Sequence, residues 1–247
     1  MKSAFTEKLI HAHQSNDKYP NLSADDPLAT MPLAYEIQKQ FVEQLNKEVI
    51  GYKAALTAEP LQKMMGIEEP ISGILFNSGD CSNQTTIKSH RDLLIETELG
   101  FQTKVAITKP IQPEEAYSLM ECFYPMIEVA SPNLTSQPSG VDLVASNSAS
   151  FGFIKGTPTD CNNVDPDSID VNLNHEGNNL HSNLCSTVMS GQAHALAWLI
   201  NQVISLFGEV KANSLLMSGS VGPAHPGQPG SYSAEFGQLD KITFEIE

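Results

Sequence analysis

Two glutamates separated by a single residue, Glu96 and Glu98, have the spacing that points most directly to chemistry. They lie in ETELGF, within a stretch whose apolar and polar residues alternate as in a strand. Residues i and i+2 of a strand share one face and lie about 6.8 Å apart along it, so two carboxylates there repel each other unless a positive charge intervenes. Mg²⁺ or Mn²⁺ would supply that charge, because both prefer hard oxygen ligands. The alternative is a solvated polar face on an edge strand.

Glu128 is a third candidate ligand. It is flanked by Met126, Ile127 and Val129 in the apolar run YPMIEVA, where a carboxylate needs a partner to offset its burial. If its strand lies beside that of Glu96, three carboxylates meet at one place. The sequence therefore predicts a carboxylate site for a divalent metal.

Lys53 is the candidate for proton transfer. It lies in the strand-like run GYKAALT, beside alanine and leucine residues. Burial there would lower the pKa of its ammonium group, so that it could exchange protons near neutral pH. The alternative is a surface lysine whose stem covers apolar neighbours while its charge stays in water.

The histidines and serines give weaker signals. His11, His13, His175 and His181 lie in polar loop or terminal sequence without the HExxH spacing of a zinc site. His225 lies in GPAHPGQPG, which indicates a structural turn more than a pocket wall. The run SGSVG lacks the first glycine of a Gly-x-Ser-x-Gly elbow, and no phosphate-binding loop occurs. Nucleophilic catalysis is therefore not indicated.

The elements that must position these residues form an α+β pattern. Leucine, isoleucine and phenylalanine recur every four residues over 32–49 and predict a helix, with Pro32 in its first turn. Further helices are expected at 60–68, 113–122 and 189–207, and a loop at 69–90. Strands are expected at 49–57, 94–107, 124–130, 141–146, 151–155, 168–174, 214–218 and 241–246. The chain thus reads as an N-terminal helical portion, 1–50, before a β-rich catalytic domain, 51–247.

Composition excludes several classes of protein. The 247 residues carry a net charge of −15, which disfavours nucleic acid and anionic membranes as partners. The four cysteines are widely spaced without a Cys-x-x-Cys motif, which argues against a zinc ribbon or a disulfide framework. No signal-like or membrane-spanning apolar segment is evident. These features predict a cytoplasmic protein.

Five blocks, in order along the chain, resemble the fumarylacetoacetate hydrolase superfamily in its 2-keto-4-pentenoate hydratase branch. The blocks are GYKAALTAEPLQKMMGIEEPISGILF, ETELGF, YPMIEVASPNL, VASNSASFGFIKG and the segment from SGQAHALAW to DKITFEI. The resemblance extends from about residue 32 to the C-terminus. It implies a mixed β-sandwich or roll of the superfamily's C-terminal type with an N-terminal helical portion, assembled as a homo-oligomer.

The resemblance also implies roles for particular residues. Glu96, Glu98 and Glu128 match the family's metal carboxylates, which implies Mg²⁺ or Mn²⁺ as cofactor, and Lys53 matches its acid–base lysine. The implied substrate-binding positions are Asp80, Ser146, Asn147, Gly219 and Ser220. The implied substrate is a small 2-oxo or 2-hydroxy-dienoic acid.

The activity implied is the addition of water to a 2-hydroxy-dienoate. Two alternatives stay open: a 2-oxo-3-hexenedioate (4-oxalocrotonate) decarboxylase, or a catalytically weakened member that binds a metal and a 2-oxo acid. The chain has Tyr52 where the family has arginine. The second alternative rests on two other departures, Ser146 where the family has aspartate and the aspartate that is missing after Glu128. After Glu128 the chain reads Val-Ala-Ser-Pro instead of Ile-Val-Asp-Ser-Arg.

Overall fold

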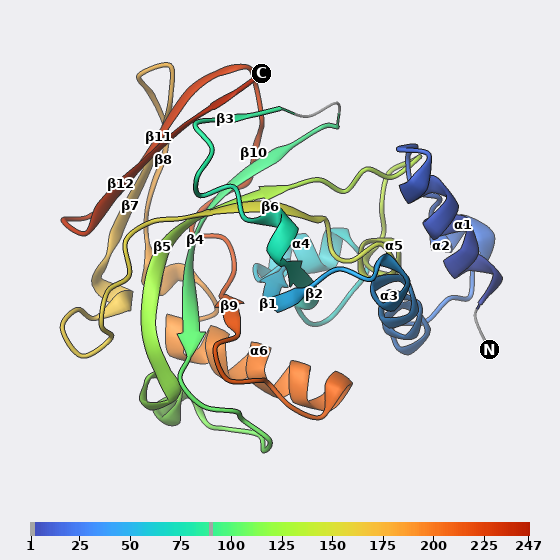
Figure 1. Ribbon diagram of the computed structural model, residues 1–247, viewed down its shortest axis with the longest axis horizontal. Helices are drawn as coiled ribbons and strands as arrows, with labels where there is room; N and C mark the ends of the chain where they lie inside the picture. Colours follow the sequence, from blue (N-terminus) through green and yellow to red (C-terminus); the bar gives the residue numbers. More distant parts are fainter. Residues whose placement is uncertain (1–2, 89–90) are drawn as a thin grey trace.

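Helices form the N-terminal part of the chain. In the computed structural model, which describes residues 3–88 and 91–247, α1 (Ala4–Gln14), α2 (Leu22–Asp25) and α3 (Met31–Leu45) precede the first strand. The buried face of α3 includes Ala34, Ile37 and Phe41, and it packs on α1 and on α5 (Gly140–Ala145) in one apolar cluster. Figure 1 shows these helices in blue at one end of the molecule. The predicted N-terminal helical portion is confirmed.

Two sheets make up the rest of the fold. The larger has the order β2-β1-β9-β4-β5-β6, with β10 paired to β4, and the smaller has the order β3-β12-β11-β7-β8. Pairing is antiparallel except between β1 and β9 and between β12 and β3. The strands are β1 (Val49–Ala55), β2 (Ile71–Phe76), β3 (Thr86–Ile87), β4 (Leu94–Thr103), β5 (Met120–Ala130), β6 (Ser150–Lys155), β7 (Asp170–His175), β8 (Asn178–Leu184), β9 (Leu215–Met217), β10 (His225–Pro226), β11 (Gly230–Phe236) and β12 (Asp240–Ile246).

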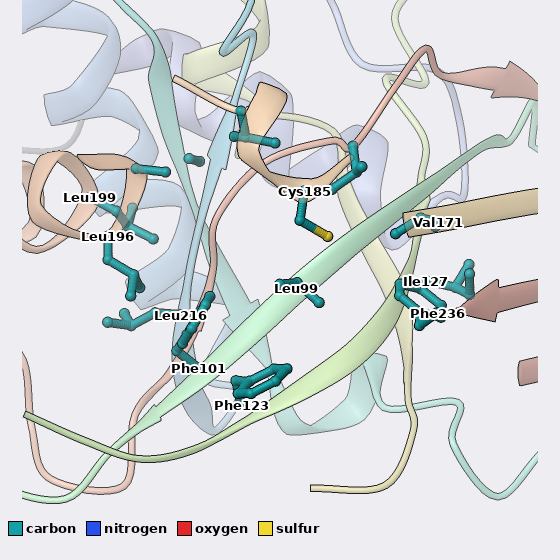
Figure 2. Packing of buried hydrophobic residues seen from close by; sticks show 14 of the residues in the cluster. Leu99, Phe101, Phe123, Ile127, Val171, Cys185, Leu196, Leu199, Leu216 and Phe236 are labelled. Atoms are coloured by element: carbon teal, nitrogen blue, oxygen red, sulfur yellow. The ribbon is translucent and has the colours of Figure 1, made fainter. Parts of the chain in front are cut away.

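The main core joins both sheets and the long helix α6 (Gln192–Phe207). Leu196 and Leu199 of α6 lie near Leu216 of β9, while Ile127 of β5 lies close to Phe236 of the smaller sheet (Figure 2). All five side chains are fully buried. Burying one such side chain contributes roughly 1.5–3 kcal/mol, so this core fixes the position of the central strands β4 and β5.

Several predicted elements are wrong, and each error has a local cause. Residues 141–146 are helix α5 instead of a strand, because Ser139 and Asp142 form a capping box that starts a helix. The predicted loop 69–90 contains β2, and 113–122 holds two short 3₁₀ turns followed by the start of β5. Strands β8 and β11 were missed because their sequences are rich in asparagine and serine.

The remaining boundaries shift by a few residues, and the predicted α+β class with curled mixed sheets is confirmed. None of the helices in residues 3–88 and 91–247 has the length and apolarity that a bilayer crossing would need. The short helix α4 (Glu59–Met64) lies between β1 and β2 in the sequence and contributes to the site described next.

Candidate active site

The strand pairing brings the three predicted glutamates together. Glu96 of β4 and Glu128 of β5 are direct partners in the antiparallel register, and Glu98 follows two residues along β4. Each offers one carboxylate oxygen, and these atoms lie within 4.8 Å of one another. The i, i+2 spacing on one strand and the register with its neighbour are sufficient to build this cluster.

Glu98 is the most deeply placed of the three, with no exposed surface. The backbone N–H of Gly219 donates to its Oε2 at 3.0 Å. Its Oε1 has no hydrogen-bond partner among the described residues. A buried carboxylate oxygen without a partner is costly, so this atom is poised to bind a ligand that carries positive charge.

The carboxylates raise one another's affinity for protons. Burial and the charge of Glu128 raise the pKa of Glu96 to about 7, although Lys53 and a hydrogen bond from Ser220 oppose the rise. Burial, then Glu128 and Glu96, raise the pKa of Glu98 well above its ordinary value. Three carboxylates with an unpartnered oxygen therefore fit a hard divalent cation, which would bind all of them in their charged form.

Lys53 is fully buried and forms an ion pair with Glu128. Burial lowers the pKa of its ammonium group, but the charges of Glu128, Glu96 and Glu98 together outweigh that effect and raise it. The expectation of a lowered pKa is therefore wrong for the metal-free protein, because the glutamates supply three charges where the local sequence shows only alanine and leucine. Lys53 is held as a protonated hydrogen-bond donor.

A cavity of about 280 Å³ opens on this cluster. Lys53, Glu96 and Ser220 lie at its polar end, and most other lining side chains are apolar. The apolar part comes from α4, the end of β1, β2, α5 and the loops after β5: Leu56, Leu61, Met64, Met65, Ile71, Pro132, Pro138 and Leu143. Lys53 is the only basic side chain among the described residues that line it. The cavity therefore suits a small molecule with one polar end and an apolar body.

The turn after β9 shapes the polar end of the cavity. Gly219 has φ +114°, and a Cβ there would lie 2.5 Å from Cγ2 of Thr57. The position accordingly requires glycine, and the resulting conformation aims the Gly219 N–H at Glu98. Ser220, the next residue, lines the cavity and hydrogen-bonds Glu96.

Three predicted substrate-binding residues lie elsewhere. Asp80 forms an ion pair with Lys155 at 2.8 Å and does not line this cavity. The Ser146 hydroxyl donates to the carbonyl of Asp142, and the Asn147 side chain bonds both backbone groups of Ile74. Substrate binding by Asp80, Ser146 and Asn147 stays a prediction.

Ser148 and Ala149 line the cavity instead, and sequence reasoning missed them. Three consecutive residues, Asn147, Ser148 and Ala149, have left-handed φ values of 70°, 51° and 59°. Of the three, only Asn147 is of a type that adopts this conformation readily. Because the chain turns here, its side chains do not alternate between two faces as they would in an extended strand. No sequence signal fixes such a run.

Two histidines support the other face of β4. The Nδ1 atom of His181, on β8, lies 2.9 Å from Nε2 of His225, and its Nε2 atom lies 3.0 Å from the Thr97 hydroxyl. Thr97 donates its proton to the carbonyl of Val221, so His181 carries its own proton on Nε2 and accepts from His225. Burial and His225 lower the pKa of His181 to about 4, which keeps it neutral. His11 and His13 lie in the N-terminal segment as predicted, on helix α1, whereas His175 and His181 lie on strands β7 and β8 and not in loops.

Comparisons with known proteins agree with this geometry. The chain is 25% identical over 237 residues to a 2-keto-4-pentenoate hydratase of Paraburkholderia xenovorans (strain LB400), covering 94% of this chain and 87% of that protein. It is 26% identical over 238 residues to a 2-hydroxyhexa-2,4-dienoate hydratase of Comamonas testosteroni, with 91% and 89% covered. The chain is thus similar in sequence to these hydratases. No family model matches the chain.

Solved structures show the same fold. The 4-oxalocrotonate decarboxylase of Pseudomonas putida G7, complexed with magnesium and adipate, superposes with a TM-score of 0.92 at 21% identity, over 99% of this chain and 96% of that chain. A fumarylpyruvate hydrolase of Pseudomonas aeruginosa, complexed with Mn²⁺ and pyruvate, has a TM-score of 0.62 at 13% identity, with 79% and 88% covered. The resemblance predicted from the sequence blocks is confirmed.

Proposed function

We propose that this chain is a divalent-metal-dependent hydro-lyase that adds water to a small 2-hydroxy-dienoic acid with a single carboxylate. The observation that carries the proposal is the convergence of three glutamates, of which Glu96 lines a largely apolar cavity together with Lys53. Hydratases that match over about nine-tenths of the chain support the reaction class.

The proposed metal ligands are Glu96, Glu98 and Glu128, with Mg²⁺ or Mn²⁺ as the ion. Their fit rests on the unpartnered Oε1 of Glu98 and on the raised pKa of two of the three carboxyls. When bound, the cation supplies Lewis-acid polarisation of the oxygens at the 2-oxo acid end of a substrate. Structures of this fold complexed with magnesium or Mn²⁺ support this choice of ions.

Lys53 is the proposed acid–base residue. Its ammonium group lines the cavity and is kept charged by Glu128, so it donates a proton to the substrate when the dienol is converted to its 2-oxo form. The conversion moves a proton from the enol oxygen to carbon without net uptake, so the enol oxygen's proton returns to the Lys53 amine, and the charge of Glu128 favours this protonated form. Gly219 and Ser220 act by fixing the carboxylates of Glu98 and Glu96, and Ser220 also offers a hydroxyl to the substrate.

The cavity supports a monoacid substrate over a dioic one. A second carboxylate at the far end of the substrate would meet apolar side chains such as Leu61, Met64 and Leu143. Lys53, the one basic lining residue within the described chain, is already paired with Glu128. Burying an unpaired carboxylate costs several kcal/mol, so the chemistry of the cavity favours a hydratase of monoacids over a 2-oxo-3-hexenedioate decarboxylase. Homo-oligomer formation and a cytoplasmic location stay predictions of the resemblance.

The test follows freshly generated 2-hydroxypenta-2,4-dienoate by proton NMR with the purified protein, first with Mg²⁺ or Mn²⁺ and then with EDTA. We expect metal-dependent formation of 4-hydroxy-2-oxopentanoate that is lost in Glu98→Gln. The control is Glu245→Gln, which neutralises a glutamate of β12 that does not line the cavity.

Three results would overturn the proposal. If the chain fails to bind Mn²⁺ in titration calorimetry, the glutamate cluster is not a metal site. If it binds Mn²⁺ but converts neither the dienoate nor 2-oxo-3-hexenedioate, the chain is a weakened member that has kept the metal site and lost turnover. Release of carbon dioxide from the dioic acid without hydration of the monoacid would establish the decarboxylase instead.

A further inference from the structure

A buried amide at the start of α6 is linked to the glutamate cluster by hydrogen bonds. Gln192 is the first residue of that helix and has no exposed surface. Ala195 and Leu196, three and four residues further along, lie on the same face of α6 and are also fully buried. An apolar side chain would suit this face, because burying an amide is costly unless its polar groups are hydrogen-bonded. The groups that Gln192 bonds should therefore explain its presence.

The amide of Gln192 joins two segments of the chain. Its Nε2 donates to the carbonyl of Cys185 at 2.8 Å, and its Oε1 accepts from the hydroxyl of Ser218 at 2.6 Å. Turning the amide over would place its oxygen against the carbonyl oxygen of Cys185, which cannot donate a proton. Gln192 therefore presents an acceptor to Ser218, and not a donor.

Ser218 is the residue from which the turn after β9 starts. It is fully buried, and its N–H donates to the carbonyl of Leu99 on β4 at 3.1 Å. Its hydroxyl has a single proton and lies 3.0 Å from that same carbonyl and 2.6 Å from Oε1 of Gln192. The shorter distance assigns the proton mainly to Gln192. Ser218 is thus held by β4 through its backbone and by α6 through its side chain.

The next N–H of the turn reaches a candidate metal ligand. Gly219 donates to Oε2 of Glu98 at 3.0 Å, and the turn rejoins β4 where the N–H of Val221 donates to a carbonyl at 2.7 Å. Gly219 has φ +114°, in a region where glycine is free to move, so its own backbone preference does not select one direction for this N–H. The bonds on either side must select it, and Gln192 anchors the preceding side through Ser218.

We propose that Gln192 is a positioning residue for the metal site. By holding Ser218, it aims the Gly219 N–H at Oε2 of Glu98 and leaves Oε1, which has no partner among the described residues, to bind a cation. The inference rests on the proposed function, in which the glutamates bind a divalent metal. Removing a group that orients a metal ligand without touching the ion typically weakens metal binding roughly 10–100-fold.

The test is titration calorimetry of Mn²⁺ into the metal-free full chain, repeated for Gln192→Met. Methionine has a similar length but is at most a weak acceptor for the Ser218 hydroxyl. We expect Gln192→Met to bind Mn²⁺ about tenfold more weakly than the parent protein, or worse. The control is Gln202→Met, the same substitution on the same helix at a half-buried position that does not line the cavity, and it should leave the affinity unchanged.

A second variant shows whether the effect passes through Ser218. Ser218→Ala removes the hydroxyl that Gln192 holds and should weaken Mn²⁺ binding to a similar degree. The double variant should bind Mn²⁺ no more weakly than either single variant, because both substitutions remove the same hydrogen bond. Metal-free thermal unfolding of each variant separates a loss of stability, which a merely structural residue would also cause, from the loss of affinity.

The outcomes distinguish this inference from the proposed function. If the parent protein does not bind Mn²⁺, the glutamates are not a metal site and both fail. If the parent binds Mn²⁺ and Gln192→Met binds it equally well, Gln192 is a structural residue and this inference alone fails. If Gln192→Met does not fold, an unchanged Mn²⁺ affinity in Ser218→Ala overturns the inference in its place. Additive losses in the double variant would also overturn it, because Gln192 and Ser218 would then act by separate routes.

Discussion

Replacing Lys53 by methionine removes the only cation that faces the glutamate cluster among the described residues of its cavity. Lys53 and Glu128 each expose 2% of their side chains. Breaking a buried ion pair by removing one partner costs about 3–5 kcal/mol, because the remaining charge has no compensation. In a domain of this size 1 kcal/mol corresponds to about 2–4 °C, so we expect the apparent Tm of metal-free Lys53→Met to fall by about 6–20 °C.

The penalty should depend on pH in a definite direction. The pKa of Glu96 is raised to about 7, and the pKa of Glu98 is raised well above its ordinary value, so both carboxyls can take up protons below neutrality. A carboxyl whose folded pKa lies above its unfolded value costs stability increasingly as pH rises toward and through the folded pKa. Without Lys53 this cost increases, so the deficit of the variant should be larger at pH 8.5 than at pH 6.

A divalent cation should reverse much of the loss. Lys53 repels a cation that approaches Glu128, so its removal should increase the affinity for Mn²⁺ while proton transfer and activity are lost. Thermal unfolding with and without Mn²⁺ would then show a larger stabilisation of Lys53→Met than of the parent protein. Lys241→Met is the control, because its exposed pair with Glu235 is worth about 0–1 kcal/mol. An unchanged metal-free Tm, or weaker Mn²⁺ binding in the variant, would refute this account of the site.

Three further predictions follow from other parts of the site and its support. Gly219→Ala should lower stability by about 1–3 kcal/mol and weaken Mn²⁺ binding, because a Cβ at φ +114° clashes with Thr57. Adding Thr57→Ser should relieve the clash but not the backbone strain, and urea unfolding of both variants would measure the difference. Hydrogen bonds from Ser23 and Ser139 outweigh burial and lower the pKa of Asp142, so Asp142→Asn should cost about 1–3 kcal/mol at pH 7. The difference in stability between the two proteins should shrink as the pH falls below about 3.9, the ordinary pKa of aspartate, and then through the lower pKa of Asp142 in the folded protein. Urea midpoints at pH 7 and pH 3 would measure it. Leu61→Arg places a cation at the apolar end of the cavity and should raise kcat/KM for a dioic 2-hydroxy-dienoate relative to the monoacid, and an unchanged ratio would contradict the proposed basis of substrate choice.

The glutamate cluster could be predicted because it depends on short-range rules. The i, i+2 spacing of Glu96 and Glu98 places both on one face of any strand, and the polar residue in YPMIEVA marks Glu128. The sign of the pKa change at Lys53 could not be predicted, since it depends on charges that lie on β4 and β5. Which side chains of residues 146–149 line the cavity could not be predicted either, because this depends on three consecutive residues with left-handed φ values.

The cavity at the glutamate cluster can recognise an anion only through a cation. A 2-oxo acid would have to approach carboxylates there, which it can do only if a divalent cation reverses the local charge. EDTA should therefore abolish binding of a 2-oxo acid at this cavity. Binding that survives EDTA would show that another group of the chain supplies the positive charge.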